Sequence, residues 1–174
     1  HINNFQISPV SNAGIPLARI SNDFDYDNRN SSAPDIGADE YFEQFPLSGD
    51  YAVGLSSSDL PGVYETITAA INDLNLRGAS GPVRFLLLDN NYNSETLPIA
   101  ITSWSGASAS NTLTIKPNTG VTSSISGNGN PAVFDINTGD YFILDGSNAI
   151  GGNSKDLTIS NTSSSSSTIR FIND

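Results

Sequence analysis

Short apolar runs that recur between turn-forming residues constrain the fold of this chain more than any other feature. Each run has the length and the β-branched and aromatic content of a strand, and clusters of Gly, Asn, Pro and Ser separate them. The runs are VRFLLL at 83–88, TLTIK at 112–116, AVFDI at 132–136, YFILD at 141–145, LTIS at 157–160 and TIRFI at 168–172. The second half of the chain is therefore predicted to consist of short strands.

The spacing of these runs predicts how the strands are arranged. Pairs of inward-pointing residues recur at steps of 30, 29 and 27 residues: Val83/Phe85, Leu113/Ile115, Phe142/Leu144 and Ile169/Phe171. A period in this range indicates stacked repeats, and the runs at 122–125, 132–136 and 157–160 supply further faces of each repeat. We expect a short right-handed parallel β-helix. A β-sandwich is the alternative, because short strands at regular intervals are also typical of that fold.

One helix is expected ahead of these strands, over residues 64–77. Apolar residues fall on one helical stripe, and Gly78 suits the stop that follows. The stripe consists of Val63, Ile67, Ala70, Ile71 and Leu74. A helix here would cover the first rung of the β-helix, where core and strand edges would otherwise be exposed. The last rung, around TIRFIND, is expected to be open.

Composition narrows the partners. Eighteen acidic and seven basic residues give a formal charge of −11, which repels phosphate backbones and anionic lipid, so we expect no nucleic-acid partner. There is no cysteine and no apolar stretch of the roughly 20 residues that span a bilayer, so we expect no membrane insertion. A composition rich in Ser, Asn, Thr, Gly and Asp is typical of an exported β-rich protein with many turns. The start at His1 suggests a chain processed or excised from a longer one.

An acidic cluster occupies residues 21–41, SNDFDYDNRNSSAPDIGADEY. Three of its aspartates alternate as in the first half of a calcium loop, and acidic residues further on offer the remaining ligands. The predicted calcium ligands are Asp23, Asp25, Asp27, Asp35, Asp39 and Glu40. The pattern departs from an EF-hand at Asn28 and Pro34, where that loop has glycine and glutamate. A salt bridge from Arg29 to these carboxylates accounts for the cluster equally well without a metal.

Other residues with chemical potential have structural explanations. Asp135, Asp140 and Asp145 are candidate acid–base carboxylates for glycoside cleavage, but they occupy turn positions and strand faces that need no chemistry. Trp104 and Tyr141 are candidates for stacking on glycan rings, although a tryptophan beside a turn more commonly packs over a rung. We therefore expect no enzymatic activity. Calcium is the one cofactor that the sequence suggests.

Two segments resemble parts of large bacterial cell-surface proteins that are built from parallel β-helix repeats and exported by the type IX route. The first resembles the family's β-helix terminus, S-P-x-x-x-x-G, then D-x-D-G-x-x-R, then D-I-G-A-x-E. Its matching residues are Ser8, Pro9, Gly14, Asp23, Asp25, Arg29, Asp35, Ile36, Gly37, Ala38 and Glu40. Tyr26 departs from the pattern, since the family has glycine there. The second segment, from LSGDYAVG through the helix to LLLDNNYN and YFILDGSN, is similar to the start of such a β-helix.

The order of the two segments sets the functional expectation, because a terminator precedes an initiator. The resemblance implies a terminator arm at 1–45 that completes a β-helix, its own or a neighbour's, and a capping helix with rungs at 46–174. A fragment spanning two consecutive β-helices is the other interpretation. We expect an extracellular or cell-surface structural protein, a unit of a filament or giant adhesin that assembles head to tail. The expected interface joins Ile2, Phe5 and Ile7 to Ile169 and Phe171. A carbohydrate-binding or polysaccharide-degrading β-helix is the alternative function.

Overall fold

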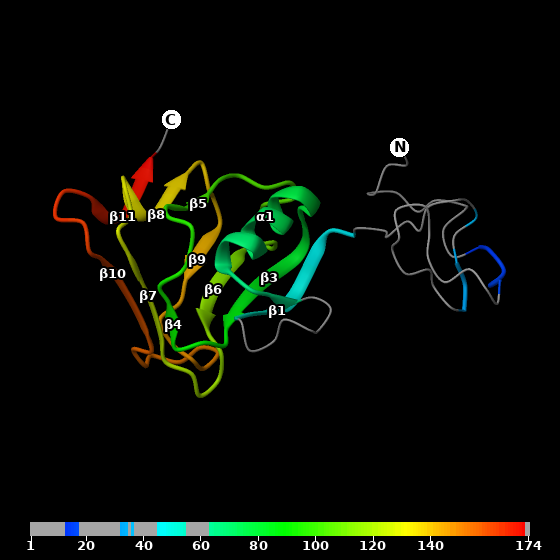
Figure 1. The fold of residues 1–174 in the computed structure, drawn as a ribbon, viewed down its shortest axis with the longest axis horizontal. Helices are drawn as coiled ribbons and strands as arrows, with labels where there is room; N and C mark the ends of the chain where they lie inside the picture. The colour runs from blue at the N-terminus through cyan, green and yellow to red at the C-terminus, as the bar shows by residue number, and fades with distance from the viewer. Residues whose placement is uncertain (1–12, 18–31, 35, 37–44, 55–62, 173–174) are drawn as a thin grey trace. The chain divides into compact units, whose positions relative to one another are not determined.

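The computed structural model describes residues 13–17, 32–34, 36, 45–54 and 63–172 (Figure 1). The chain divides into two compact units, His1–Pro46 and Leu47–Asp174. In the first unit, the backbone amide of Gly14 donates a hydrogen bond to the carbonyl of Pro34 at 2.7 Å. All the strands and the helix of the described residues belong to the second unit.

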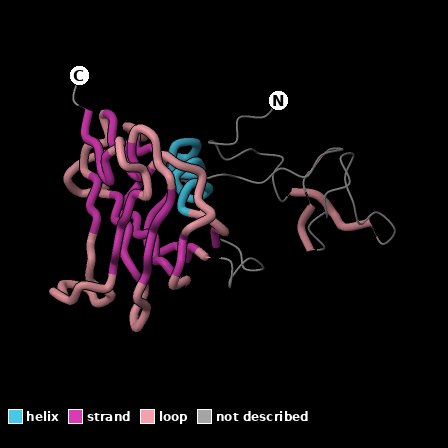
Figure 2. The backbone as a smooth tube through the Cα atoms, turned by 60° about the vertical axis from the view of Figure 1, so that its left-hand side comes forward, coloured by secondary structure: helices cyan, strands magenta, loops and turns pink. Residues whose placement is uncertain are grey.

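The second unit is built from three parallel sheets (Figure 2). Sheet 1 has the order β2 (Val63–Tyr64), β1 (Leu47–Val53), β3 (Ala79–Leu87), β6 (Leu113–Pro117), β9 (Phe142–Leu144). Sheet 2 has the order β4 (Asn91–Tyr92), β7 (Ser123–Gly127), β10 (Leu157–Asn161). Sheet 3 has the order β5 (Ile99–Ile101), β8 (Ala132–Asn137), β11 (Ser167–Ile172).

Three successive strands form one rung, with one strand in each sheet. The first rung is β3–β5, the second is β6–β8 and the third is β9–β11. Each strand pairs in parallel with the equivalent strand of the next rung. The fold is therefore a mainly β, parallel β-solenoid of about three turns, and the prediction of a parallel β-helix is confirmed in place of a sandwich.

Inward-pointing side chains stack in columns from rung to rung. In β3 every second residue from Ala79 to Leu87 is buried, as strand alternation requires. Sheet 1 places Val83 beside Leu113 and Leu113 beside Phe142, while Phe85, Ile115 and Leu144 form the adjacent column. The predicted repeat is confirmed for these three pairs. Their burial makes one continuous core along the solenoid axis.

The fourth predicted pair belongs to a different face. Ile169 lies in register with Phe134, and Phe171 with Ile136, so both residues extend sheet 3 and do not follow Phe142 in sheet 1. Sheet 3 repeats at steps of 35 residues, from Ile99 to Phe134 to Ile169. The assignment from sequence was wrong because turns of unequal length separate the faces, and the step of 27 residues happened to fall near the true period. The strands β4 and β5 also escaped prediction, because runs of two and three residues carry too little pattern.

The helix α1 (Ile67–Arg77) begins later than the predicted 64–77. Val63 and Tyr64 pair with β1 as a short strand, and Thr66 caps the helix by accepting a hydrogen bond from the amide of Ala69 at 3.0 Å. At the other end Gly78 has a φ of 73°, and its amide donates to the carbonyl of Leu74 at 2.7 Å. The predicted glycine stop is therefore confirmed.

A carboxylate from the first rung fixes the N-terminus of α1. Glu95, in the loop between β4 and β5, accepts hydrogen bonds from the amides of Ile67 at 2.8 Å and Thr68 at 3.1 Å. The Thr68 hydroxyl donates to the same carboxylate at 2.9 Å. Three donors at the positive end of a helix dipole are a favourable environment for a negative charge. Glu95 thus ties the helix to the rung that the helix covers.

The apolar stripe of α1 faces the solenoid. Ile67, Ala70, Ile71 and Leu74 are buried in the same core cluster as Ile99 of the first rung. In Figure 1, α1 and β1 lie at one end of the solenoid and β10 and β11 lie at the other. Among the described residues, no helix has the length and apolar character needed to cross a bilayer.

Candidate functional site: the third rung

The third rung presents apolar side chains that its predecessors bury. We call this set the third-rung surface. Its members point inward by register but stay partly accessible, and one of them is largely exposed: Phe142, Leu144, Leu157, Ile159, Ile169 and Phe171. The equivalent inward positions of the first two rungs are buried. The surface is therefore the core of the solenoid seen from one end.

One column of sheet 3 shows this gradient most clearly. Ile101, Ile136 and Phe171 occupy the same position in successive rungs. Their exposed fractions are 1%, 7% and 76%. Phe171 follows the inward alternation of its strand, so its exposure reflects the lack of a fourth layer over it among the described residues and not an outward orientation. A further layer of side chains would bury this ring as the third rung buries Ile136.

The strand edges of the third rung point the same way along the solenoid axis. β9, β10 and β11 are the end strands of their sheets, each pairing with a single neighbour among the described strands. A parallel edge carries a row of backbone N–H and C=O groups that a further strand can use. Apolar side chains and strand edges are thus available together, which is the combination that β-strand addition requires.

Arg170 attaches the edge strand β11 to the second rung. Its Nε and Nη2 atoms donate to the two carboxylate oxygens of Asp135, each at 2.8 Å. The two residues are register partners on the outer face of sheet 3. The guanidinium holds the pKa of Asp135 below its usual range. A paired fork of this kind fixes orientation as well as charge.

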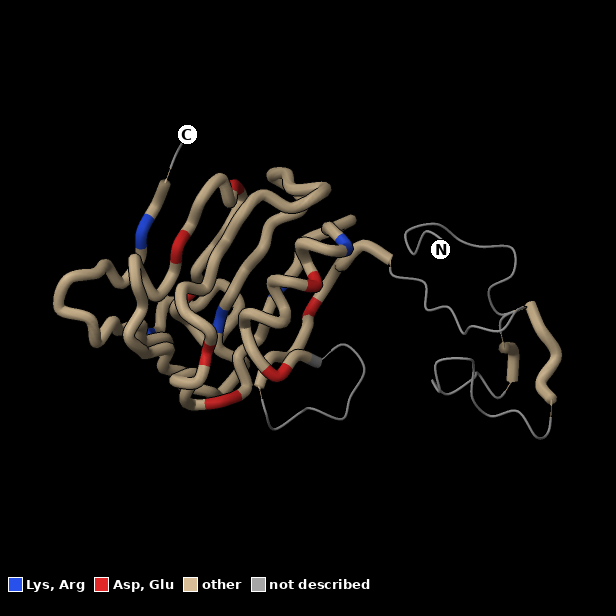
Figure 3. The backbone as a smooth tube through the Cα atoms, turned by 45° about the horizontal axis from the view of Figure 1, so that its top comes forward, with Lys and Arg blue, Asp and Glu red and all other residues tan. Residues whose placement is uncertain are grey.

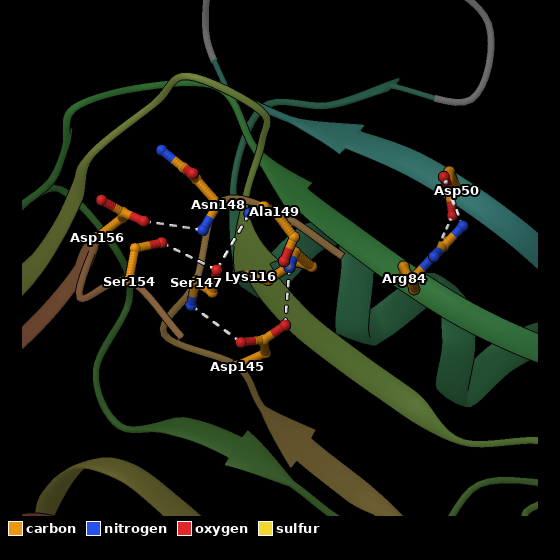
Figure 4. Close-up of polar contacts among 9 residues, drawn as sticks. All are labelled: Asp50, Arg84, Lys116, Asp145, Ser147, Asn148, Ala149, Ser154 and Asp156. Carbon is orange, nitrogen blue, oxygen red and sulfur yellow. Dashed lines mark hydrogen bonds and ion pairs between the residues drawn. The ribbon is translucent and has the colours of Figure 1, made fainter. Parts of the chain in front are cut away.

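A second ion pair, with a buried lysine, anchors the loop that follows β9 (Figure 4). The ammonium of Lys116 donates to Asp145 at 2.7 Å and to the carbonyl of Ala149 at 3.0 Å. Lys116 is 3% exposed. The lysine bond holds the pKa of Asp145 below its usual range, and the amide of Ser147 adds to this by donating to the same carboxylate at 2.9 Å.

The rest of this loop, residues 145–156, forms hydrogen bonds within itself. The amide of Asn148 donates to Asp156 at 3.0 Å, and the hydroxyls of Ser147 and Ser154 lie 3.0 Å apart. Figure 4 shows these groups gathered beside Lys116. The loop is therefore a folded structural element, with a lysine from the second rung supplying its cation.

A third inter-rung ion pair lies at the helix-covered end of sheet 1 and is also drawn in Figure 4. Arg84 of β3 donates from Nη2 to Asp50 of β1 at 2.9 Å, again between register partners. Its side chains are 35% and 42% exposed, so solvent screens this pair more than the lysine pair. Figure 3 shows few charged residues on the described solenoid, and these three pairs account for several of them.

The aspartates considered for catalysis do not form a paired site. Asp135 and Asp145 lie on different sheets, and each is bound to its own basic partner. Both have a lowered pKa, whereas a carboxylic acid that donates a proton at neutral pH needs a raised one. Asp140 is exposed in the turn before β9, where its amide donates to Thr138.

The two aromatic residues considered for glycan contact have different environments. Trp104 is 6% exposed and belongs to the core cluster, so its ring faces are not available for stacking on a sugar. The packing interpretation made from the sequence describes this residue. Tyr141 is 48% exposed, beside β9. Glycan binding itself stays a prediction.

Several predicted site residues lie outside the described residues. They comprise the proposed calcium ligands Asp23, Asp25, Asp27, Asp35, Asp39 and Glu40, the proposed salt-bridge residue Arg29, and the arm residues Ile2, Phe5 and Ile7. Within the part of the chain that the structure describes, no group of three or more acidic or histidine side chains could hold a metal ion. The calcium and arm predictions are therefore carried by the sequence alone.

Two residues of structural importance were not recognised from the sequence. Lys116 follows an apolar run, which is the one signal that could have marked it as buried. Glu95 carries no local signal, because the helix it caps begins 28 residues earlier. Contacts between rungs join residues about 30 apart, and only the stacking register reveals them.

The geometry defines the class: a parallel β-solenoid of about three turns, covered by a helix at one end and apolar at its third rung. No family model, curated protein or solved structure matches the chain.

Proposed function

We propose that this protein is a non-enzymatic structural component of an extracellular or cell-surface assembly, which joins copies end to end through the third rung. The finer identity, a filament unit or part of a large adhesin, follows the resemblance described above. The observation that carries the proposal is the exposure of Phe171 at a position where the two previous rungs bury isoleucine.

The two ends of the solenoid support this proposal by their contrast. One end carries α1, whose apolar stripe is spent on the core. The other combines unpaired strand edges with half-exposed apolar side chains, which favours association with a further layer. The segment proposed to supply that layer is residues 1–45 of a neighbouring copy. Such a contact is heterologous and propagates unless rotation closes a ring.

Size measurements on the purified 174-residue chain test the proposal. Light scattering and electron microscopy should show fibres or higher oligomers that grow with concentration. Phe171→Ser should reduce the assembled fraction at least tenfold while circular dichroism stays unchanged. Leu76→Ser is the matched control, because Leu76 is 57% exposed on α1 at the opposite end. A monomer at all concentrations, or equal losses in the two variants, would contradict the proposal.

Deletion of residues 1–45 addresses the role of the arm. We expect the truncated chain to keep the cooperative unfolding of the rungs and to lose assembly. An unfolded truncated chain would instead identify the arm as an intramolecular cap.

A further inference from the structure

The repeated pattern of sheet 3 specifies what a fourth strand must look like. Each strand of this sheet places two inward apolar residues on either side of one outward residue, in register with the next strand. The three triplets are Ile99-Ala100-Ile101, Phe134-Asp135-Ile136 and Ile169-Arg170-Phe171. A strand that continues the sheet beyond β11 therefore needs a bulky apolar residue, a residue compatible with Arg170, and a second bulky apolar residue.

The N-terminal sequence contains a triplet of this kind, Phe5-Gln6-Ile7. We propose that residues 5–7 of a second copy add in parallel beside β11, with Phe5 over Ile169, Gln6 beside Arg170 and Ile7 over Phe171. This inference rests on the proposed function and supplies its register. It places the identical chain on both sides of the contact, as donor and as acceptor.

Charge at the outward position agrees with this register. Arg170 is already paired with Asp135 through two bonds of 2.8 Å. A neutral glutamine on its other side adds a carbonyl that accepts hydrogen bonds from a guanidinium, and it introduces no like charge.

Chain chemistry also limits the length of the added strand. Pro9 lacks a backbone N–H and is confined to strand ends and edges, so a paired strand has to finish before it. The short triplet that remains is the same length as β5, which has three residues. An added strand of this size is therefore sufficient to continue sheet 3.

Cross-linking between engineered cysteines tests the register, and the absence of native cysteine makes the result unambiguous. Chains carrying Gln6→Cys are mixed with chains carrying Arg170→Cys and oxidised gently. Register partners on adjacent parallel strands lie about 5 Å apart, within reach of a disulfide. Thr168→Cys is the control partner, since two residues of offset raise the separation to about 8 Å, beyond that reach. We expect at least tenfold more covalent dimer with Arg170→Cys than with Thr168→Cys.

Three results would overturn the register while leaving the proposed function intact, provided light scattering still shows assembly. They are equal cross-linking at both partners, cross-linking of Asp25→Cys in the second apolar triplet Phe24-Asp25-Tyr26, and no cross-linking at all. A double variant, Gln6→Cys with Arg170→Cys, distinguishes the remaining case: a disulfide confined to monomers identifies closure within one chain. Loss of assembly in the unmodified chain would instead overturn the proposed function.

Discussion

The ammonium of Lys116, on the last but one residue of β6, lies 2.7 Å from the carboxylate of Asp145 at the end of the next strand in the sheet. The second rung thereby holds the 145–156 loop of the third rung in place. The contact is local, but it decides whether the third rung keeps the conformation on which the proposed assembly surface depends. The first prediction concerns its strength.

Asp145→Asn should lower the free energy of unfolding by about 1–3 kcal/mol, because it leaves a buried ammonium with a neutral partner. Asp50→Asn is the matched control in the screened Arg84 pair, with an expected loss below about 1 kcal/mol. Urea unfolding at neutral pH measures both. Equal losses would show that burial of Lys116 does not strengthen its ion pair.

Acid should weaken the protein through the same carboxylates. Asp135 and Asp145 have pKa values below the ordinary 3.8, the first through Arg170 and the second through Lys116. A depressed pKa contributes stability that is complete above the unfolded value and is lost as pH falls toward the folded value. Stability should therefore stay level down to about pH 4 and drop below it. Thermal unfolding from pH 7 to pH 2 checks this, and Asp145→Asn should show a smaller acid loss than the unmodified chain.

Glu95→Gln should loosen α1 from the first rung. The amide keeps one acceptor oxygen but loses the charge that faces the helix dipole and the second acceptor, so we expect a loss of about 1 kcal/mol. Faster hydrogen exchange at the amides of Ile67 and Thr68 is the specific readout. Glu65→Gln, an exposed neighbour of the helix start, is the control. Unchanged exchange at both amides would rule out a capping role for Glu95.

The sequence predicted the solenoid because alternation and a period near 30 residues are properties of local patterns. Val83, Leu113 and Phe142 could be aligned on that basis, and the helix stripe with its Gly78 stop could be recognised by spacing alone. Phe171 could not be assigned to its sheet, because turn lengths differ between the faces and only pairing with β8 fixes its column. Glu95 and Lys116 act across rungs, and no pattern within either segment marks their partners.

Alkaline pH should destabilise the helix-covered end through buried tyrosines. Tyr92 donates to the carbonyl of Val53 at 2.6 Å, and burial raises its pKa to about 12. Tyr64 also has a raised pKa, because of burial and its hydrogen bond to Asp73. A raised pKa contributes stability that is complete below the unfolded value of about 10 and is lost as pH rises through the folded value. Unfolding midpoints measured from pH 9 to pH 12 should fall, and Tyr92→Phe should show a shallower fall.

The turn that leads from the second rung to the third contains a backbone conformation that its sequence disfavours. Thr138 has a φ of 58°, in the left-handed region that β-branched residues rarely adopt, and Tyr141 in the same turn has a φ of 60°. Asparagine tolerates this region much better. Thr138→Asn should therefore stabilise the protein by about 1 kcal/mol, which is a rise of roughly 2–4 °C in Tm for a chain of this size.

Thr114→Asn is the control for this substitution, since Thr114 lies in the extended strand β6, where the same change should lower Tm. Differential scanning calorimetry of both variants gives the comparison. An unchanged or lower Tm for Thr138→Asn would mean that the hydrogen bond from the Thr138 hydroxyl to the Asn137 carbonyl, at 2.6 Å, offsets the backbone strain. The turn would then be held by that bond, and the third rung would depend on it for its position.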